Sequence, residues 1–479
     1  MPAPLAALLG VAALLGVAWS LVTPAFQAPD ENAHFAYLQS VGERFALPGD
    51  SRRLRLSREQ TLAANASNSD QAAANLATTM QWSADAYRRW RALEARLPSS
   101  FRSDGGGPNP AGPNPPLYYL YEAGAYRLAE RGDLFTRLQA ARLASVVWML
   151  VTVAGVWLLA GEAFGRNRLL QVAAAGLAAL APMVGFVSGT LNPDAMLYAT
   201  WSIVLWLGVR LLRRGLSPWR AGALLAAVGV ACLVKATSYA LLPGTALVLG
   251  IALWRAPVSR RRRVAALGAG AAGIAVTLGA WVVFAHSTHR PIASQVTSVA
   301  TGGGTSLNLR ELASYLWQFY LPRLPFQQPF HLHAPTLPVY DVWLKQAWGA
   351  FGWLEVQFPG WLYVALTAAT IAVAAVALSG LWRVRRAVDW AVPAFLAVVT
   401  LSLLAGLHWT EYRFLARRLG PFNSGRYLLP LVGIAGLTLA QAIRRLRPQA
   451  RGVAVAGVLG GLFVLNLYSL GLMLVRFYA

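Results

Sequence analysis

The sequence predicts an all-α protein that crosses a membrane many times. Of its 479 residues, 56% are hydrophobic and only 13% are charged, whereas a typical soluble domain carries about 25% charged residues. The hydrophobic residues occur in runs of roughly 20, the helix length that spans a bilayer. Arginines gather in short connectors between these runs, a pattern typical of polytopic membrane proteins.

We expect about eleven transmembrane helices and treat residues 1–479 as a single integral membrane domain. The first run lacks a basic start and a clear cleavage site, so it is predicted to be a retained anchor and not a signal peptide. The number of spans within 220–255 is left open by the pattern. The expected spans are 4–23, 138–160, 168–188, 195–213, 220–235, 238–255, 264–285, 360–382, 390–408, 428–443 and 453–475.

The basic connectors predict the orientation of the chain. The net charge is +23, but the charges are scattered among hydrophobic runs, which argues against nucleic-acid binding. Placing the N-terminus in the cytoplasm puts every basic connector on the cytoplasmic side, as the positive-inside rule requires. These connectors are 210–220, 259–263, 383–386 and 444–451.

Two long segments, 24–137 and 286–359, then become extracytoplasmic loops. The first opens with a predicted interfacial helix, because apolar residues recur at helical spacing from Ala33 to Phe45. The lone cysteine, Cys232, lies in an apolar run, where we expect it to pack as a small hydrophobic residue.

Polar residues at membrane depth are few, and the predicted topology places them at the outer ends of helices. Ionisable groups near the bilayer are costly and mark candidate functional sites. The candidates are Asp30, Glu31 and His34 after the first span, Asn192 and Asp194 in a tight turn, Lys235 at a span end and Arg426 at a span start.

Each candidate also has a purely structural interpretation. Asp30 and Asp194 each follow a proline and could cap a helix, with Glu31 favoured in a first turn. His34 could form a local hydrogen bond. Lys235 could extend to the headgroups, and Arg426 could anchor a membrane edge.

Transfer of a sugar from a polyprenyl-phosphate carrier fits such a cluster. A carboxylate, Asp30 or Glu31, could act as the general base for an acceptor hydroxyl. Nearby Lys or Arg would stabilise the negative charge of the departing phosphate. A single displacement would invert the sugar carbon. A carboxylate pair with a histidine could also hold a divalent cation such as Mg or Mn.

Six short motifs, in order along nearly the whole chain, resemble a family of bacterial membrane proteins catalogued as a domain of unknown function. That family is similar in architecture to the GT-C glycosyltransferases, which use polyprenyl-phosphate sugars. The motifs are "PAFQAPDENAH" (24–34), "NPPLYYL" (114–120), "SGTLNPDA" (188–195), "LVKATSYALLP" (233–243), "WGAFGWLEVQFPGW" (348–361) and "GRYLLP" (425–430).

The GT-C resemblance implies a catalytic acid in the first external loop, which matches Asp30 first and Glu31 second. His34, Asn192, Asp194, Lys235 and Arg426 match further polar positions and are expected to bind substrate. We expect the chain to depart from many GT-C members, because the sequence predicts no sizeable soluble C-terminal domain. Its acceptor would therefore be recognised by the two long loops or by a partner.

The leading hypothesis is a hexosyl- or pentosyltransferase of the bacterial inner membrane, with an extracytoplasmic active face. Its acceptor would be an envelope glycan, lipid or protein. Two rivals stay open. A transporter or flippase of lipid-linked sugars would place charges near the midplane and often contain repeats, and a non-catalytic envelope scaffold would not need the polar cluster.

Overall fold

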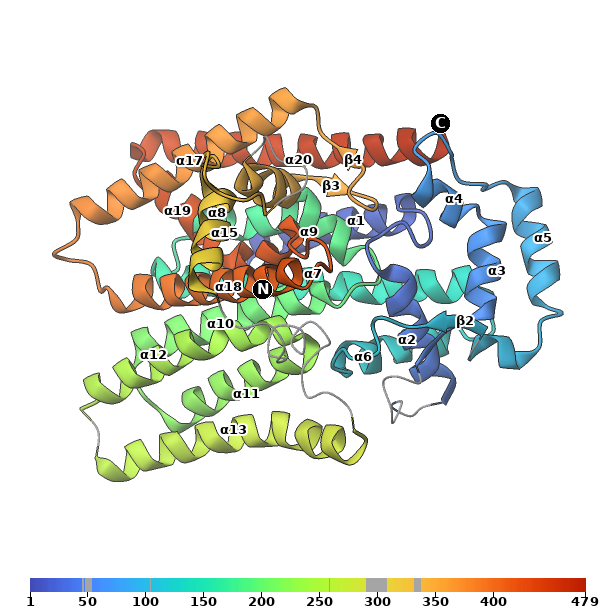
Figure 1. The fold of residues 1–479 in the computed structure, drawn as a ribbon. Helices are drawn as coiled ribbons and strands as arrows, with labels where there is room; N and C mark the ends of the chain where they lie inside the picture. The colour runs from blue at the N-terminus through green and yellow to red at the C-terminus, as the bar shows by residue number, and fades with distance from the viewer. Residues whose placement is uncertain (45–46, 48–53, 104, 258, 290–307, 331–336) are drawn as a thin grey trace.

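The computed structural model confirms an all-α membrane fold. It describes residues 1–479 apart from 45–46, 48–53, 104, 258, 290–307 and 331–336 (Figure 1). Within the described residues, nine helical segments are long and apolar enough to cross a membrane. They are α1 (Ala3–Val22), α7 (Leu134–Ala163), α10 (Asp194–Arg214), η3 with α12 (Ala236–Ala240, Leu241–Arg255), α13 (Arg260–Ser287), α17 (Gly360–Arg383), α18 (Ala391–Ala416), η5 with α19 (Gly425–Leu431, Val432–Arg444) and α20 (Pro448–Tyr478).

Two further predicted spans correspond to a broken pair and a short helix. Helices α8 (Arg168–Leu180) and α9 (Pro182–Ser188) meet at a 55° bend, and α11 (Pro218–Val234) has only 17 residues. Pro182 opens α9 and cannot continue the hydrogen-bond ladder of α8. The Asn466 side chain donates to the Leu180 carbonyl at 2.6 Å and accepts from Trp19 at 2.8 Å. The count of eleven spans stays a prediction.

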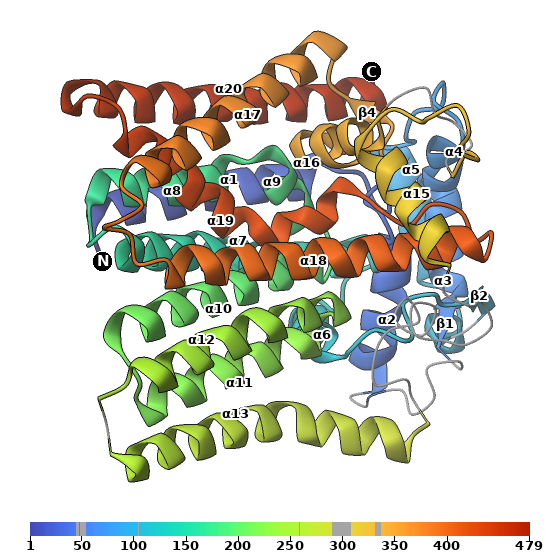
Figure 2. The same cartoon turned by 60° about the vertical axis from the view of Figure 1, so that its left-hand side comes forward.

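The helices run so that the predicted cytoplasmic and external connections lie at opposite ends (Figure 2). The first loop and helices α15 (Leu309–Tyr320) and α16 (Gln346–Trp348) lie at one end. The basic connections α10–α11, α12–α13, α17–α18 and α19–α20 lie at the other. Which end faces the cytoplasm stays a prediction.

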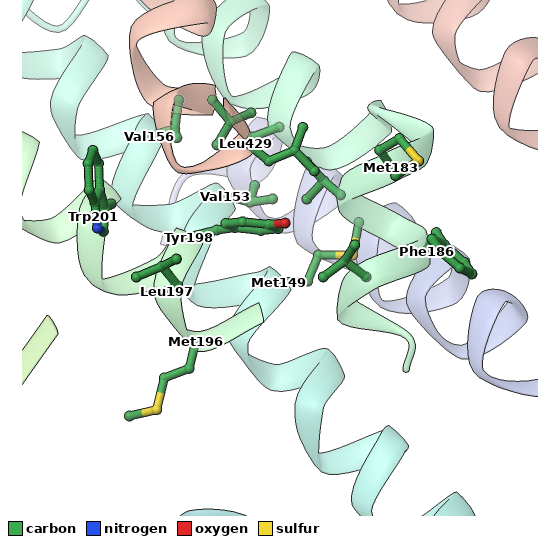
Figure 3. Close-up of a cluster of buried hydrophobic side chains, with 14 of the residues drawn as sticks. Met149, Val153, Val156, Met183, Phe186, Met196, Leu197, Tyr198, Trp201 and Leu429 are labelled. Atoms are coloured by element: carbon green, nitrogen blue, oxygen red, sulfur yellow. The ribbon is translucent and has the colours of Figure 1, made fainter. Parts of the chain in front are cut away.

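A hydrophobic core fixes the start of α10, which carries part of the candidate site. Tyr198 and Trp201 of α10 are fully buried against side chains of α7, α9 and η5 (Figure 3). Because this core holds the helix over its first two turns, the Asn192–Asp194 turn has a defined position. Cys232 is also buried, as expected.

The first loop folds into its own small layer of helices and one short antiparallel strand pair, Arg55–Ser57 with Gly105–Pro108. The prediction that the apolar face of its first helix contacts the membrane interface is wrong, because that face is covered by protein. Ala33, Tyr37, Leu38 and Val41 are buried in protein, because α6 (Leu117–Leu128) packs across this face. Phe45 lies outside the described residues. The loop helices are α2 (Glu31–Arg44), α3 (Arg58–Ala66), α4 (Ser69–Ala74), α5 (Ala84–Glu94), η2 (Ser99–Arg102) and α6 (Leu117–Leu128).

The described part of the second loop contains α15, η4 (Val339–Lys345), α16 and the strand pair Ala350–Phe351 with Val356–Gln357. The predicted span 390–408 ends too early, because α18 continues to Ala416. The last residue of the predicted span, His408, has partners in the second loop. His408 contacts the hydroxyls of Tyr315 and Tyr320, both at 2.8 Å, which fixes α15 against α18.

Candidate functional site

The loop between α1 and α2 presents Asp30 in an unusual backbone conformation. Asp30 has a φ of 64°, in the left-handed region, where a non-glycine residue is held only by its surroundings. Its carbonyl accepts the amide of His34 at 3.0 Å and so begins α2. Its side chain is 49% exposed, more than any other charged group of the candidate site.

A buried ion pair behind Asp30 holds this loop. Both oxygens of Glu31 contact the guanidinium of Arg142, at 2.7 and 2.5 Å. They also accept the backbone amides of Phe26 and Leu191, at 2.9 and 3.0 Å. Arg142 in turn donates to the carbonyls of Ser20, Thr23 and Pro24. Glu31 is fully buried, and each of its two oxygens accepts hydrogen bonds from two donors.

Arg426 reaches Asp30 from η5. Its Nη2 donates to Asp30 Oδ2 at 2.6 Å, and its Nη1 lies 3.4 Å from the Pro29 carbonyl. The neighbouring Gly425 allows this approach, because a Cβ there would lie 2.4 Å from the backbone nitrogen of Ala347. Burial is the largest single influence and opposes ionisation of Asp30. The attractions of Arg426, His34 and Lys235 and the Arg426 hydrogen bond together outweigh it, so the Asp30 pKa lies below its ordinary value.

A further ion pair, Lys235 with Asp194, lies beside the Asp30–Arg426 pair. Lys235, at the break after α11, donates to Asp194 Oδ1 at 2.6 Å and lies 5.2 Å from the Tyr427 ring centre. The Asn192 side-chain oxygen accepts the Asp194 amide at 3.0 Å in the turn before α10, and its side-chain amide donates to the Pro29 carbonyl at 3.3 Å. The Pro29 carbonyl therefore ties the Asn192 turn and Arg426 to the Asp30 loop. Asp194 Oδ2 is buried and has no partner among the described residues.

His34 completes the cluster from α2. Its Nδ1 lies 2.8 Å from the Tyr119 hydroxyl, and that hydroxyl also accepts from Asn114 at 3.2 Å. Burial lowers the His34 pKa to about 4, against the attraction of Asp30 and with smaller contributions in the same direction from the cations Lys235 and Arg426. His34 is therefore neutral at neutral pH and contributes hydrogen bonds, not charge.

We expect His34 to make folding stability depend on pH. An unfolded imidazole has a pKa near 6.5, so between about 6.5 and 4 the unfolded chain binds the proton and the folded chain does not. The free energy of unfolding therefore keeps its full value above about pH 6.5. It decreases by up to about 3 kcal/mol as the pH is lowered to about 4. The thermal midpoint of wild type should drop more between pH 7.5 and 4.5 than that of His34→Gln. Equal drops would contradict the assignment.

The structure thus brings six of the seven predicted residues together: Asp30, His34, Asn192, Asp194, Lys235 and Arg426. Glu31 lies behind them with its oxygens already occupied. The described residues include no group of three or more His, Cys, Asp or Glu side chains able to hold a metal ion. Asp30 and Asp194 pair with Arg426 and Lys235, and a divalent cation at this cluster stays a prediction.

Sequence reasoning missed Arg142 and Tyr119. Arg142 lies inside the predicted span 138–160 and is buried. A charged residue within a predicted span is costly and indicates a buried partner, so the sequence did contain a signal for Arg142. Tyr119 stood in the quoted motif 114–120, but nothing in the sequence placed it beside His34.

Comparisons with known proteins agree with this architecture. The search of curated proteins finds no match. Among solved structures, AglB from Archaeoglobus fulgidus, in complex with an inhibitory peptide and a dolichol-phosphate, aligns with a TM-score of 0.50 at 11% identity, covering 99% of this chain and 56% of that one. ArnT from Cupriavidus metallidurans bound to undecaprenyl phosphate aligns with a TM-score of 0.48 at 14% identity, covering 98% and 75%. Apo ArnT from the same organism aligns with a TM-score of 0.47 at 17% identity, covering 94% of this chain and 62% of that one.

At such identity the AglB likeness shows a shared fold only, and the chain spans little more than half of AglB. The family evidence covers most of this chain. One family model matches residues 13–435, a range that includes all seven predicted site residues. The chain belongs to the family described as "Predicted membrane protein (DUF2142)".

Proposed function

We propose that this protein is a membrane glycosyltransferase that moves a sugar from a polyprenyl-phosphate donor to an acceptor hydroxyl on the extracytoplasmic face. The observation that carries the proposal is the charge cluster at one end of the bundle. It contains one half-exposed carboxylate, Asp30, and two cations, Arg426 and Lys235, each held by a carboxylate. ArnT and AglB were solved with undecaprenyl phosphate and dolichol-phosphate respectively, which fits a lipid-phosphate donor.

In the proposed reaction Asp30 is the general base. It removes the proton of the acceptor hydroxyl as the hydroxyl oxygen bonds to the sugar carbon. The bond from that carbon to the phosphate oxygen breaks, and the polyprenyl phosphate leaves with the electron pair. One displacement inverts the configuration.

The two cations would receive the donor phosphate. Arg426 and Lys235 hold Asp30 and Asp194 before substrate binds. A phosphate that drew Arg426 away from Asp30 would raise the Asp30 pKa and make that carboxylate a stronger base. Charged hydrogen bonds to the leaving phosphate would also stabilise the transition state.

Glu31 is better assigned as a positioning residue than as a second base. Its four hydrogen bonds and full burial leave no oxygen lone pair directed at a substrate. It fixes the loop that presents Asp30. We keep Asp30 as the proposed base and His34, Asn192, Asp194, Lys235 and Arg426 as substrate-binding or supporting residues.

The direct test is a transfer assay with purified protein in nanodiscs, labelled polyprenyl-phosphate sugars and envelope acceptors. A covalent glycosylated product that appears only with protein supports the proposal. Labelled donor that crosses sealed vesicles unchanged, with no product from any acceptor, would instead support a flippase and overturn it.

Lys235→Gln should weaken donor binding. Glutamine can still donate to Asp194, so the main loss is a charged hydrogen bond to phosphate, worth about 1.5–3 kcal/mol. We expect the Kd for polyprenyl phosphate to rise about 10- to 100-fold. The chain's only other lysine gives the control, Lys345→Gln, since Lys345 pairs with Asp341 in the second loop. If both variants bound polyprenyl phosphate with equal affinity, Lys235 would not be part of the phosphate site.

A further inference from the structure

A pocket lies beside the Arg142–Glu31 pair, apart from the charge cluster. It has a volume of about 520 Å³ and lies where the ends of α1, α7 and α20 meet the first loop. Arg142 forms part of its wall. Asp30, Asp194, Lys235 and Arg426 are not among the residues that line it, so the buried pair separates it from the proposed reaction site.

The lining of this pocket suits a hydrocarbon chain. Leu21, Phe135, Leu138 and Leu143 supply apolar walls. Leu21 and Leu143 belong to membrane-spanning helices and are 64% and 41% exposed. The pocket is therefore continuous with the surface that acyl chains cover, and its volume lies in the range of small-molecule sites.

The rim of the pocket marks the level of the lipid headgroups. Trp82 and Tyr87 of the first loop and Tyr478 at the end of α20 line it. Trp82 is half exposed. Aromatic residues of this kind concentrate where hydrocarbon meets the polar headgroups, so a chain could enter while its headgroup stayed outside.

The charges disfavour the proposed donor as the occupant. Arg142 is the pocket's only charged lining residue, and Glu31 already neutralises it through two contacts. Three backbone carbonyls also accept from it. A lipid phosphate would find no unpaired cation here, whereas an acyl chain needs none.

We propose that this pocket holds one acyl chain of a bilayer phospholipid. The chain packs against the side of α7 that carries Arg142 and so supports the loop that presents Asp30. This lipid is a structural ligand, distinct from the proposed donor.

The test uses wild-type protein in nanodiscs that contain phosphatidylethanolamine with a diazirine in one acyl chain. After illumination, labelling is mapped by mass spectrometry and compared with labelling on α17, whose exposed face (Leu378 and Trp382, for example) serves as a bulk-lipid reference. We expect peptides covering 20–25 and 135–143 to be labelled severalfold above that reference. Labelling at or below the reference would overturn the proposal without any mutation.

A matched pair of variants adds a second test. Ala140→Phe fills the pocket, and Ala154→Phe makes the same change at another half-buried position of α7 that lines no described pocket. Pocket labelling should fall severalfold in the first variant and stay at the wild-type level in the second. Equal labelling in both would contradict the assignment.

A competition arm distinguishes the two lipid sources. Excess unlabelled phosphatidylethanolamine should displace the probe, and polyprenyl phosphate should not. Displacement by polyprenyl phosphate alone would assign the pocket to the donor and overturn the proposal, while leaving the proposed transferase activity untouched.

Discussion

Replacing Asp30 with asparagine should lower the rate of sugar transfer by about 10²- to 10⁴-fold, the usual contribution of a positioned general base. Asparagine keeps the size of the side chain and its oxygen can still accept from Arg426, so the loop should stay in place. It cannot take a proton from the acceptor. The loss should therefore appear in kcat, with little change in the KM for the donor, in a transfer assay on purified protein.

The matched control is Asp85→Asn. Asp85 also lies in the first loop, at the start of α5, but its side chain is 69% exposed and pairs only with Arg88. We expect wild-type transfer from this variant. If Asp30→Asn kept wild-type kcat as well, Asp30 would not be the base and the proposed mechanism would fail.

The second large effect concerns stability. Arg142→Ala should destabilise the fold by about 3–5 kcal/mol, the cost of leaving a buried charge without its partner. Glu31 would lose two charged contacts, and the carbonyls of Ser20, Thr23 and Pro24 would lose their donor. A marked fall in the thermal midpoint and in the yield of folded protein should result.

An exposed ion pair gives the comparison for this prediction. Arg88→Ala removes the partner of Asp85 at the surface, where such pairs contribute about 0–1 kcal/mol. Removing both buried charges together, as Glu31→Gln with Arg142→Met, should recover part of the lost stability because no unpaired charge remains. Equal midpoints for Arg142→Ala and Arg88→Ala would show that the buried pair does not hold the loop.

The sequence was enough to predict the membrane fold because each span is encoded locally. Runs such as 138–160 and 453–475 are predominantly apolar, and the helices there follow directly. The end of α18 was harder. Its last turns carry Glu411 and Arg413, which look like loop residues, but Glu411 is buried and accepts the amides of Phe422 and Asn423.

The candidate site was predictable where polar residues stood at the ends of spans. Asp30, Lys235 and Arg426 were found because alternating spans bring their ends to one side. Pairing was not predictable, since Glu31 and Arg142 are 111 residues apart and the partner of each depends on how α1 and α7 pack. Glu31 looks like Asp30 in the sequence, and only tertiary contacts separate a buried support from a half-exposed base.

The central claim is that Arg426 and Lys235 form the phosphate site beside Asp30. The most direct measurement is a cryo-EM structure of the purified protein with added polyprenyl phosphate. We predict phosphate density within hydrogen-bonding distance of both cations, with the Glu31–Arg142 pair unchanged. Phosphate density elsewhere, with both ion pairs intact and no lipid near Asp30, would contradict it.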